Sequence, residues 1–143
     1  MPLYERFTKR HRDDFVTLED LRKNYALEIP DNFNFAFDCL DVLAEETPDA
    51  LALLWVSNKG EEKRFAYEDI RRLSVKAANF FTAQGIGKGD MVMLTMSRDW
   101  RYWPVLMGLH RIGAVAVPAT YLLTKKDLEY VNQDRKSVCR ERV

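Results

Sequence analysis

Residues 67–119 decide the fold, and they read YEDIRRLSVKAANFFTAQGIGKGDMVMLTMSRDWRYWPVLMGLHRIGAVAVPA. Their first part predicts an amphipathic helix, because apolar residues recur every three or four positions with charged residues between them. Gly85 is expected to end this helix in the left-handed conformation of a C-terminal cap, and residues 87–90 are expected to form a turn. The expected apolar face consists of Ile70, Leu73, Ala77, Phe80 and Phe81.

Two apolar strands are predicted after this turn, with a second helix between them. Residues 91–96 are apolar at nearly every position, which favours a central strand of a parallel sheet. The second helix is expected to start near Asp99 or later, because Pro104 would break a longer helix, and Ser97 or Asp99 is its candidate cap. Gly113 ends it before the strand at 114–118. Its expected apolar face is Trp103, Leu106, Met107 and His110.

The alternation of helix and strand indicates an α/β fold, with parallel strands joined by crossover helices. The preceding residues predict two further helices. Thr17 followed by Asp20 is a helix-start signature, so a short helix is expected at 18–25, after a charged and solvated lead-in at 9–14. Apolar spacing predicts another helix at 35–46, stopped by Thr47 and Pro48. The apolar positions of that helix are Ala36, Phe37, Leu40, Leu43 and Ala44.

A hairpin is expected between these helices, with strands at 50–56 and 63–66 around turn residues 57–60. At the other end, residues 119–123 should form a loop at the carboxyl end of a parallel strand, where ligands of open α/β sheets usually sit. Thr124 and Asp127 repeat the capping pattern, which predicts a final helix through Val131.

Composition narrows the class of protein. The chain has 143 residues, enough for one domain or a piece of one, and 47% of them are hydrophobic. Lys plus Arg and Asp plus Glu number 22 each, so no overall field favours nucleic acid or an anionic membrane. Cys39 and Cys139 are too few for a disulfide framework, and Cys39 is interpreted as a buried, inert thiol in a reducing compartment. The charged start lacks the apolar core of a signal peptide, and no run has the length of a membrane span, so a cytoplasmic location is expected.

The sequence indicates no catalytic, cofactor-binding or metal-binding residue. Residues 85–89 are rich in glycine, but they follow a helix and precede a strand, the reverse of a phosphate-binding loop, so a cap and a turn explain them better. His11 and His110 lack partners at metal-ligand spacing, and His110 is interpreted as a packing residue. The aromatic residues Trp100, Tyr102 and Trp103 either pack at a sheet edge, which their helical spacing favours, or grip a ligand by stacking.

Six short segments resemble AMP-forming acyl-CoA synthetases of the adenylate-forming superfamily, and most closely their acetyl and medium-chain acyl branch. The resemblance runs from about Asn32 to Gln133, and its segments are residues 33–38, 46–52, 65–70, 85–92, 113–118 and 124–130. It implies the opening layers of the family's large N-terminal domain, after a charged extension at 1–31. It also implies the family's reaction, in which ATP and a carboxylic acid form an acyl-adenylate, and coenzyme A then displaces AMP, with Mg²⁺ offsetting phosphate charge.

The family's phosphate loop, ribose-binding acid and adenylation lysine would all lie beyond Gln133. The expectation is therefore an N-terminal fragment that binds no cofactor and is inactive alone; the alternative is a non-catalytic α/β binding module. Reading the gene downstream for a phosphate loop distinguishes the two. Residues 134–143 lose the family pattern and are interpreted as a truncation or frameshift scar, with a genuine exposed tail as the alternative.

Overall fold

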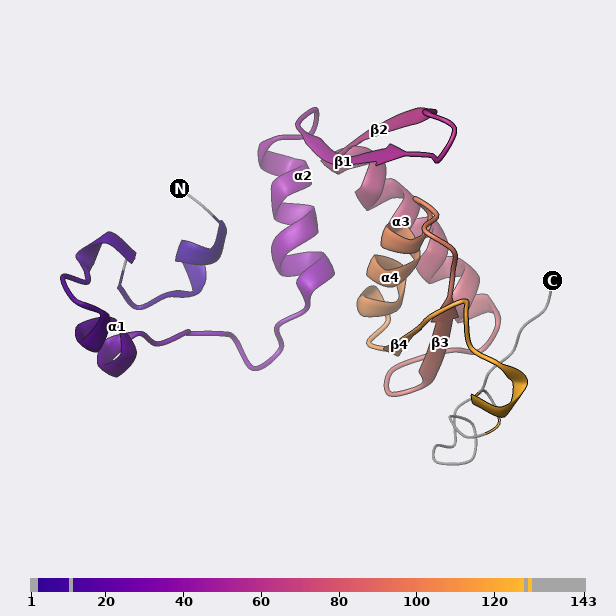
Figure 1. The fold of residues 1–143 in the computed structure, drawn as a ribbon. Helices are drawn as coiled ribbons and strands as arrows, with labels where there is room; N and C mark the ends of the chain where they lie inside the picture. The colour runs from indigo at the N-terminus through magenta and orange to yellow at the C-terminus, as the bar shows by residue number, and fades with distance from the viewer. Residues whose placement is uncertain (1–2, 11, 128, 130–143) are drawn as a thin grey trace. The chain divides into compact units, whose positions relative to one another are not determined.

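The structure is a computed structural model that describes residues 3–10, 12–127 and 129. It divides into two compact units, the first ending at Phe33 and the second beginning at Asn34 (Figure 1). Among the described residues, no helix is long and apolar enough to cross a membrane.

The first unit contains two short 3-10 helices, η1 (Leu3–Phe7) and η2 (Arg12–Asp14), followed by helix α1 (Leu18–Asn24). The predicted cap of α1 is confirmed, because the Thr17 side chain accepts a hydrogen bond from the Asp20 amide at 3.0 Å. Arg10 is not simply solvated as the sequence predicts. It pairs with Asp20 at 3.4 Å, and its guanidinium lies 4.4 Å from the centre of the Phe15 ring.

The second unit opens with the helix predicted at 35–46, which has two parts. Residues Ala36–Asp41 (η3) form a π-helix, and α2 (Val42–Glu46) continues it as an α-helix. The buried residues are Ala36, Cys39, Leu40 and Ala44, whereas Phe37 is 49% exposed. The predicted apolar face is therefore wrong at Phe37, because a π-helix bonds residues five apart and shifts the face that the 3.6-residue period predicts.

The predicted hairpin is confirmed. Strands β1 (Leu51–Val56) and β2 (Glu62–Ala66) pair antiparallel, with Trp55 opposite Lys63, and Gly60 takes a positive φ of 80° in the turn between them. The chain then enters helix α3 (Tyr67–Ala83), whose start is fixed by the Asp69 carboxylate accepting a hydrogen bond from the Ala66 amide at 3.1 Å.

The predicted parallel pair is also confirmed. Strand β3 (Met91–Thr95) pairs in parallel with β4 (Val115–Ala119), and α4 (Tyr102–Arg111) makes the crossover between them (Figure 1). Pro104 is the third residue of α4, where its missing amide costs no intrahelical hydrogen bond. Asp99 does not cap α4 directly; its carboxylate accepts from the Arg101 amide at 2.8 Å, one residue before the helix.

Helices α3 and α4 pack closely because small residues face one another at their crossing. Gly108 of α4 lies against Ser74, Ala77 and Ala78 of α3, so close that an added Cβ would lie 2.6 Å from the Ala77 Cβ atom. This contact decides which faces are buried. Phe80 and Trp103, both expected on apolar faces, are instead 61% and 50% exposed.

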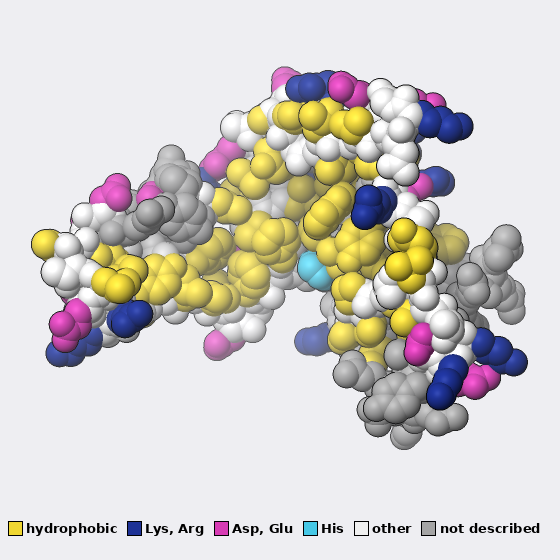
Figure 2. Space-filling model, viewed as in Figure 1, with side chains coloured by type: hydrophobic (Ala, Val, Ile, Leu, Met, Phe, Trp, Pro, Cys, Tyr) yellow, Lys and Arg dark blue, Asp and Glu magenta, His cyan; other side chains and the backbone are white. Residues whose placement is uncertain are grey.

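Two small clusters form the core of the second unit. Leu40, Ile70 and Met107 make one cluster, against which the hairpin residues Ala52, Leu53 and Phe65 pack; the other consists of Leu94, Leu109 and Ala114. Many apolar side chains still reach the surface, and Figure 2 shows hydrophobic atoms over much of the visible face. The β3–β4 pair in particular keeps Val115 43% exposed, although parallel strands are normally covered on both faces.

Candidate functional site

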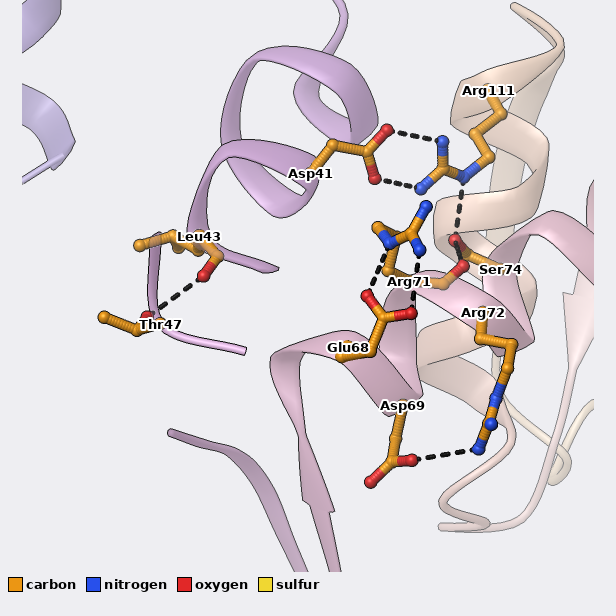
Figure 3. Close-up of polar contacts among 9 residues, drawn as sticks. All are labelled: Asp41, Leu43, Thr47, Glu68, Asp69, Arg71, Arg72, Ser74 and Arg111. Atoms are coloured by element: carbon orange, nitrogen blue, oxygen red, sulfur yellow. Dashed lines mark hydrogen bonds and ion pairs between the residues drawn. The ribbon is translucent and has the colours of Figure 1, made fainter. Parts of the chain in front are cut away.

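The most buried ion pair among the described residues lies where η3, α3 and α4 meet (Figure 3). The Arg111 side chain is only 6% exposed, and its two terminal nitrogens bind both oxygens of the Asp41 carboxylate, one at 2.8 Å. Its Nε–H donates to the Ser74 hydroxyl at 2.8 Å, and that hydroxyl donates to the Arg71 carbonyl at 2.7 Å. The guanidinium also lies 5.2 Å from the centre of the Phe37 ring. Every polar group of this Arg111 cluster is therefore paired.

Two exposed ion pairs adjoin the Arg111 cluster on α3 (Figure 3). Arg71 binds both Glu68 oxygens at 2.6 and 2.7 Å, and Arg72 binds Asp69 at 3.1 Å. Hydrogen bonding to Arg71 lowers the pKa of Glu68 below its usual value, and the same bond raises the pKa of Arg71. Both pairs join residues three positions apart on α3, so they neutralise charge along this helix, whereas the Arg111 cluster joins three helices.

The glycine-rich turn between α3 and β3 uses its own amides. The Ile86 amide donates to the Phe81 carbonyl at 3.1 Å and Gly85 has a φ of 80°, which confirms the predicted C-terminal cap. The Gly87 amide donates to the Asp90 carboxylate at 2.9 Å, and the Gly89 amide donates to the Gly113 carbonyl at 3.0 Å. A phosphate group would have to displace these bonds, so the cap-and-turn interpretation holds.

Cys39 and the His110 Nδ1 atom, which belong to two residues considered as candidates from the sequence, are both buried. Cys39 is buried as predicted. Burial is the main cause that raises the pKa of its thiol, and the negative charge of Asp38 raises it further. His110 packs edge-on to Phe35, with ring centres 6.3 Å apart. Its Nδ1 atom is buried and has no hydrogen-bond partner among the described residues, and burial lowers its pKa.

The aromatic residues of 100–103 separate into two groups. Trp100 stacks on Phe65 of the hairpin, with ring centres 4.7 Å apart, which confirms its predicted packing role. Trp103 contacts Tyr102 edge-on at 5.5 Å and remains half-exposed, so it is not part of the core.

The predicted loop at the carboxyl end of β4 lies beside the end of β3, because the last register pair joins Thr95 to Ala119. Tyr121 and Leu122 in this loop are 52% and 72% exposed. The capping pattern that follows is confirmed: the Asp127 carboxylate accepts from the Thr124 amide at 2.9 Å. The predicted end of that helix at Val131 lies outside the described residues.

The family resemblance implies ATP, coenzyme A and Mg²⁺ as cofactors of the whole protein. Within residues 3–10, 12–127 and 129, no cluster of His, Cys, Asp or Glu has the arrangement of a metal site. The amides of Gly85, Ile86, Gly87 and Gly89 already donate to protein acceptors, and Arg111 is neutralised by Asp41. The Asp41–Arg111 pair was missed in the sequence because its members are 70 residues apart.

Comparison with known proteins identifies relatives over most of the chain. Residues 40–139 match the family described as AMP-binding enzyme. The chain is 35% identical to the rat mitochondrial acyl-coenzyme A synthetase ACSM3, over 96% of this chain and 25% of that protein. It is 38% identical to rat mitochondrial ACSM4, over 89% of this chain and 22% of that protein. The chain thus spans about a quarter of the length of the curated relatives that it matches.

Solved structures agree with these matches. The N-terminal domain of FACL13 from Mycobacterium tuberculosis superposes with a TM-score of 0.63 at 28% identity, over 74% of this chain and 26% of that one. A fatty acid AMP ligase from Legionella pneumophila gives a TM-score of 0.65 at 23% identity, over 72% of this chain and 18% of that one, and this likeness concerns the fold alone.

Proposed function

Because the chain belongs to the AMP-binding enzyme family, we propose that it is the N-terminal part of an AMP-forming acyl-CoA synthetase. The observation that carries this proposal is the 35% identity to a protein named acyl-coenzyme A synthetase along 96% of the chain. The whole protein would activate a carboxylic acid with ATP to an acyl-adenylate and would transfer the acyl group to coenzyme A.

The described residues would contribute the framework of that enzyme and not its chemistry. Their most buried ion pair, Asp41–Arg111, joins helices together with Ser74, and the Gly87 and Gly89 amides of the glycine-rich turn donate to Asp90 and Gly113. We therefore assign the residues that bind ATP, coenzyme A and Mg²⁺ to parts of the whole protein other than these. On this proposal residues 32–133 belong to the AMP-binding domain, residues 1–31 form an extension, and residues 134–143 are an atypical tail, either a truncation or frameshift scar or a genuine tail.

The substrate would be a small-molecule carboxylate, and an acetyl or medium-chain acyl group is the proposed range within this class. A role in fatty acid metabolism and a cytoplasmic location are proposed with it, and no nucleic-acid partner is expected from the net charge of zero. The rat relatives are named as mitochondrial proteins, so cell fractionation with an antibody to this chain is the direct test of location.

The experiment that tests the proposed function uses the whole protein encoded with these residues. ATP–pyrophosphate exchange is measured with acetate, butyrate, hexanoate and benzoate, and AMP release on addition of coenzyme A is then measured with each acid. Carboxylate-dependent exchange followed by coenzyme-dependent AMP release, both absent from a heat-killed control, is expected. Exchange with none of the acids, from a folded whole protein, would favour the non-catalytic binding module.

A further inference from the structure

A strained loop lies at the carboxyl end of β3. Arg98 in this loop has a φ of 38°, and it is the only non-glycine residue with a positive φ in the part of the chain that the structure describes. A side chain with a Cβ atom is unfavourable in this left-handed region, and such residues persist only where their surroundings hold them. The surroundings of Arg98 should therefore contain the group that holds it.

That group is Trp55 of the β1–β2 hairpin. Its indole N–H donates a hydrogen bond to the Arg98 carbonyl at 2.8 Å, across 43 positions of sequence. The bond fixes the peptide unit that follows Arg98, because a carbonyl that accepts a bond at this distance cannot rotate freely. Indole N–H groups are donors only, so this contact has one direction.

A second contact between the hairpin and the loop supports the first. Trp100 stacks on Phe65 of β2, with an angle of 26° between the ring planes. Lys63, opposite Trp55 in the hairpin, places its Nζ atom 5.9 Å from the Trp55 ring centre and 5.2 Å from that of Trp100. Both distances are within the range of a cation–π attraction. The hairpin therefore holds the loop on both sides of Asp99.

We infer that Trp55 is a positioning residue: the hairpin acts as a latch that holds the loop 97–101 in its strained conformation at the carboxyl edge of β3. The loop begins two residues after Thr95, which pairs with Ala119, so it shares that edge with residues 120–123. Open α/β sheets bind ligands at the carboxyl ends of their strands. The latch therefore fixes the conformation of one of the two loops at this edge. The latch itself does not depend on the proposed function.

Amide hydrogen exchange of the 143-residue chain tests the latch, read residue by residue at Arg101 and Tyr102. Both amides donate to Asp99, at 2.8 and 3.1 Å, so they report on the loop. Trp55→Phe keeps a ring and removes the N–H. It should speed exchange of both amides about fivefold, within the range expected for one net hydrogen bond. Trp103→Phe is the matched control, since Trp103 is half-exposed and has no bond to the loop, and it should change exchange less than twofold.

Arg98→Gly provides the rescue, because glycine adopts a positive φ without strain. In this background Trp55→Phe should speed exchange about twofold or less, since little strain remains for the indole to hold. The inference is overturned if Trp55→Phe leaves both amides unchanged, or if it speeds exchange equally in the Arg98→Gly background. A uniform rise that includes the amides of Ile70 and Ala78 in α3 would also overturn it, because that result indicates global unfolding and no local latch.

Discussion

Replacing Arg111 by methionine should be far more damaging than the same change at Arg72. The substitution leaves the Asp41 carboxylate without its partner and removes the hydrogen bond that the Ser74 hydroxyl accepts, although this hydroxyl still donates to the Arg71 carbonyl. Removing one member of a buried ion pair costs about 3–5 kcal/mol. Asp41 is 21% exposed, so water can solvate part of its charge, and the lower end of that range, about 3 kcal/mol, is expected.

Arg72→Met is the matched control. The partners Arg72 and Asp69 are 65% and 41% exposed, and exposed pairs contribute only about 0.2–1 kcal/mol. Both variants replace arginine by methionine within a helix, so helix propensity changes little. The double variant Asp41→Leu with Arg111→Met removes both charges and should recover much of the loss.

The assay is urea unfolding of the 143-residue chain followed by far-UV circular dichroism, at concentrations where light scattering finds no aggregate. Since single domains are stable by only about 5–15 kcal/mol, a loss of about 3 kcal/mol should move the urea midpoint of Arg111→Met well below that of Arg72→Met. Equal midpoints for Arg111→Met and Arg72→Met would refute the role given to the Arg111 cluster. Additive losses in the double variant would refute the account of an unpaired carboxylate.

Three further predictions concern packing, pH and association. Gly108→Ala should lower the free energy of unfolding by about 1–3 kcal/mol in urea, because its Cβ would lie 2.9 Å from the Ala78 amide nitrogen. Gly87→Ala is the control and should be nearly neutral, because no atom lies within 4 Å of its added Cβ. Equal effects of the two substitutions would contradict the close crossing of α3 and α4. Burial lowers the pKa of His110 below 6.5, so the unfolded state binds the proton more tightly, and thermal stability should fall as pH decreases from 7 to 5. His110→Gln should flatten that dependence, and an unchanged pH profile would count against it. The chain should self-associate through the open edges of β3 and β4 as its concentration rises, and a monomer with a cooperative melt would show the opposite.

The sequence was sufficient to predict the elements that depend on the local spacing of apolar residues and glycines. The α3 helix, the turn at 87–90, the hairpin and the parallel β3–β4 pair all follow from apolar periodicity interrupted by Gly85, Gly60 and Gly113. Each of these glycines takes a positive φ, which glycine adopts without strain. The helix ends and turns at these positions could therefore be predicted without knowledge of the fold.

Features that depend on packing between elements were not accessible in the same way. Periodicity predicts a stripe on α3 that includes Phe80, but the neighbour covers the adjacent stripe because Gly108 allows α4 to approach Ser74 and Ala78. The small residues themselves were the available signal. No local spacing predicts the Asp41–Arg111 pair, since its members meet only after three helices have packed.

ATP–pyrophosphate exchange by the purified 143-residue chain, measured with acetate, butyrate, hexanoate and benzoate, tests whether these residues carry out adenylation chemistry of their own. These residues should supply framework without chemistry, because the amides of Gly85, Ile86, Gly87 and Gly89 already donate to protein acceptors and Arg111 is neutralised by Asp41. Stabilising charge on a phosphate requires donors that are free to face it. No carboxylate-dependent exchange above a heat-killed control is expected. Reproducible exchange with any one acid would contradict the assignment of these residues to framework without chemistry.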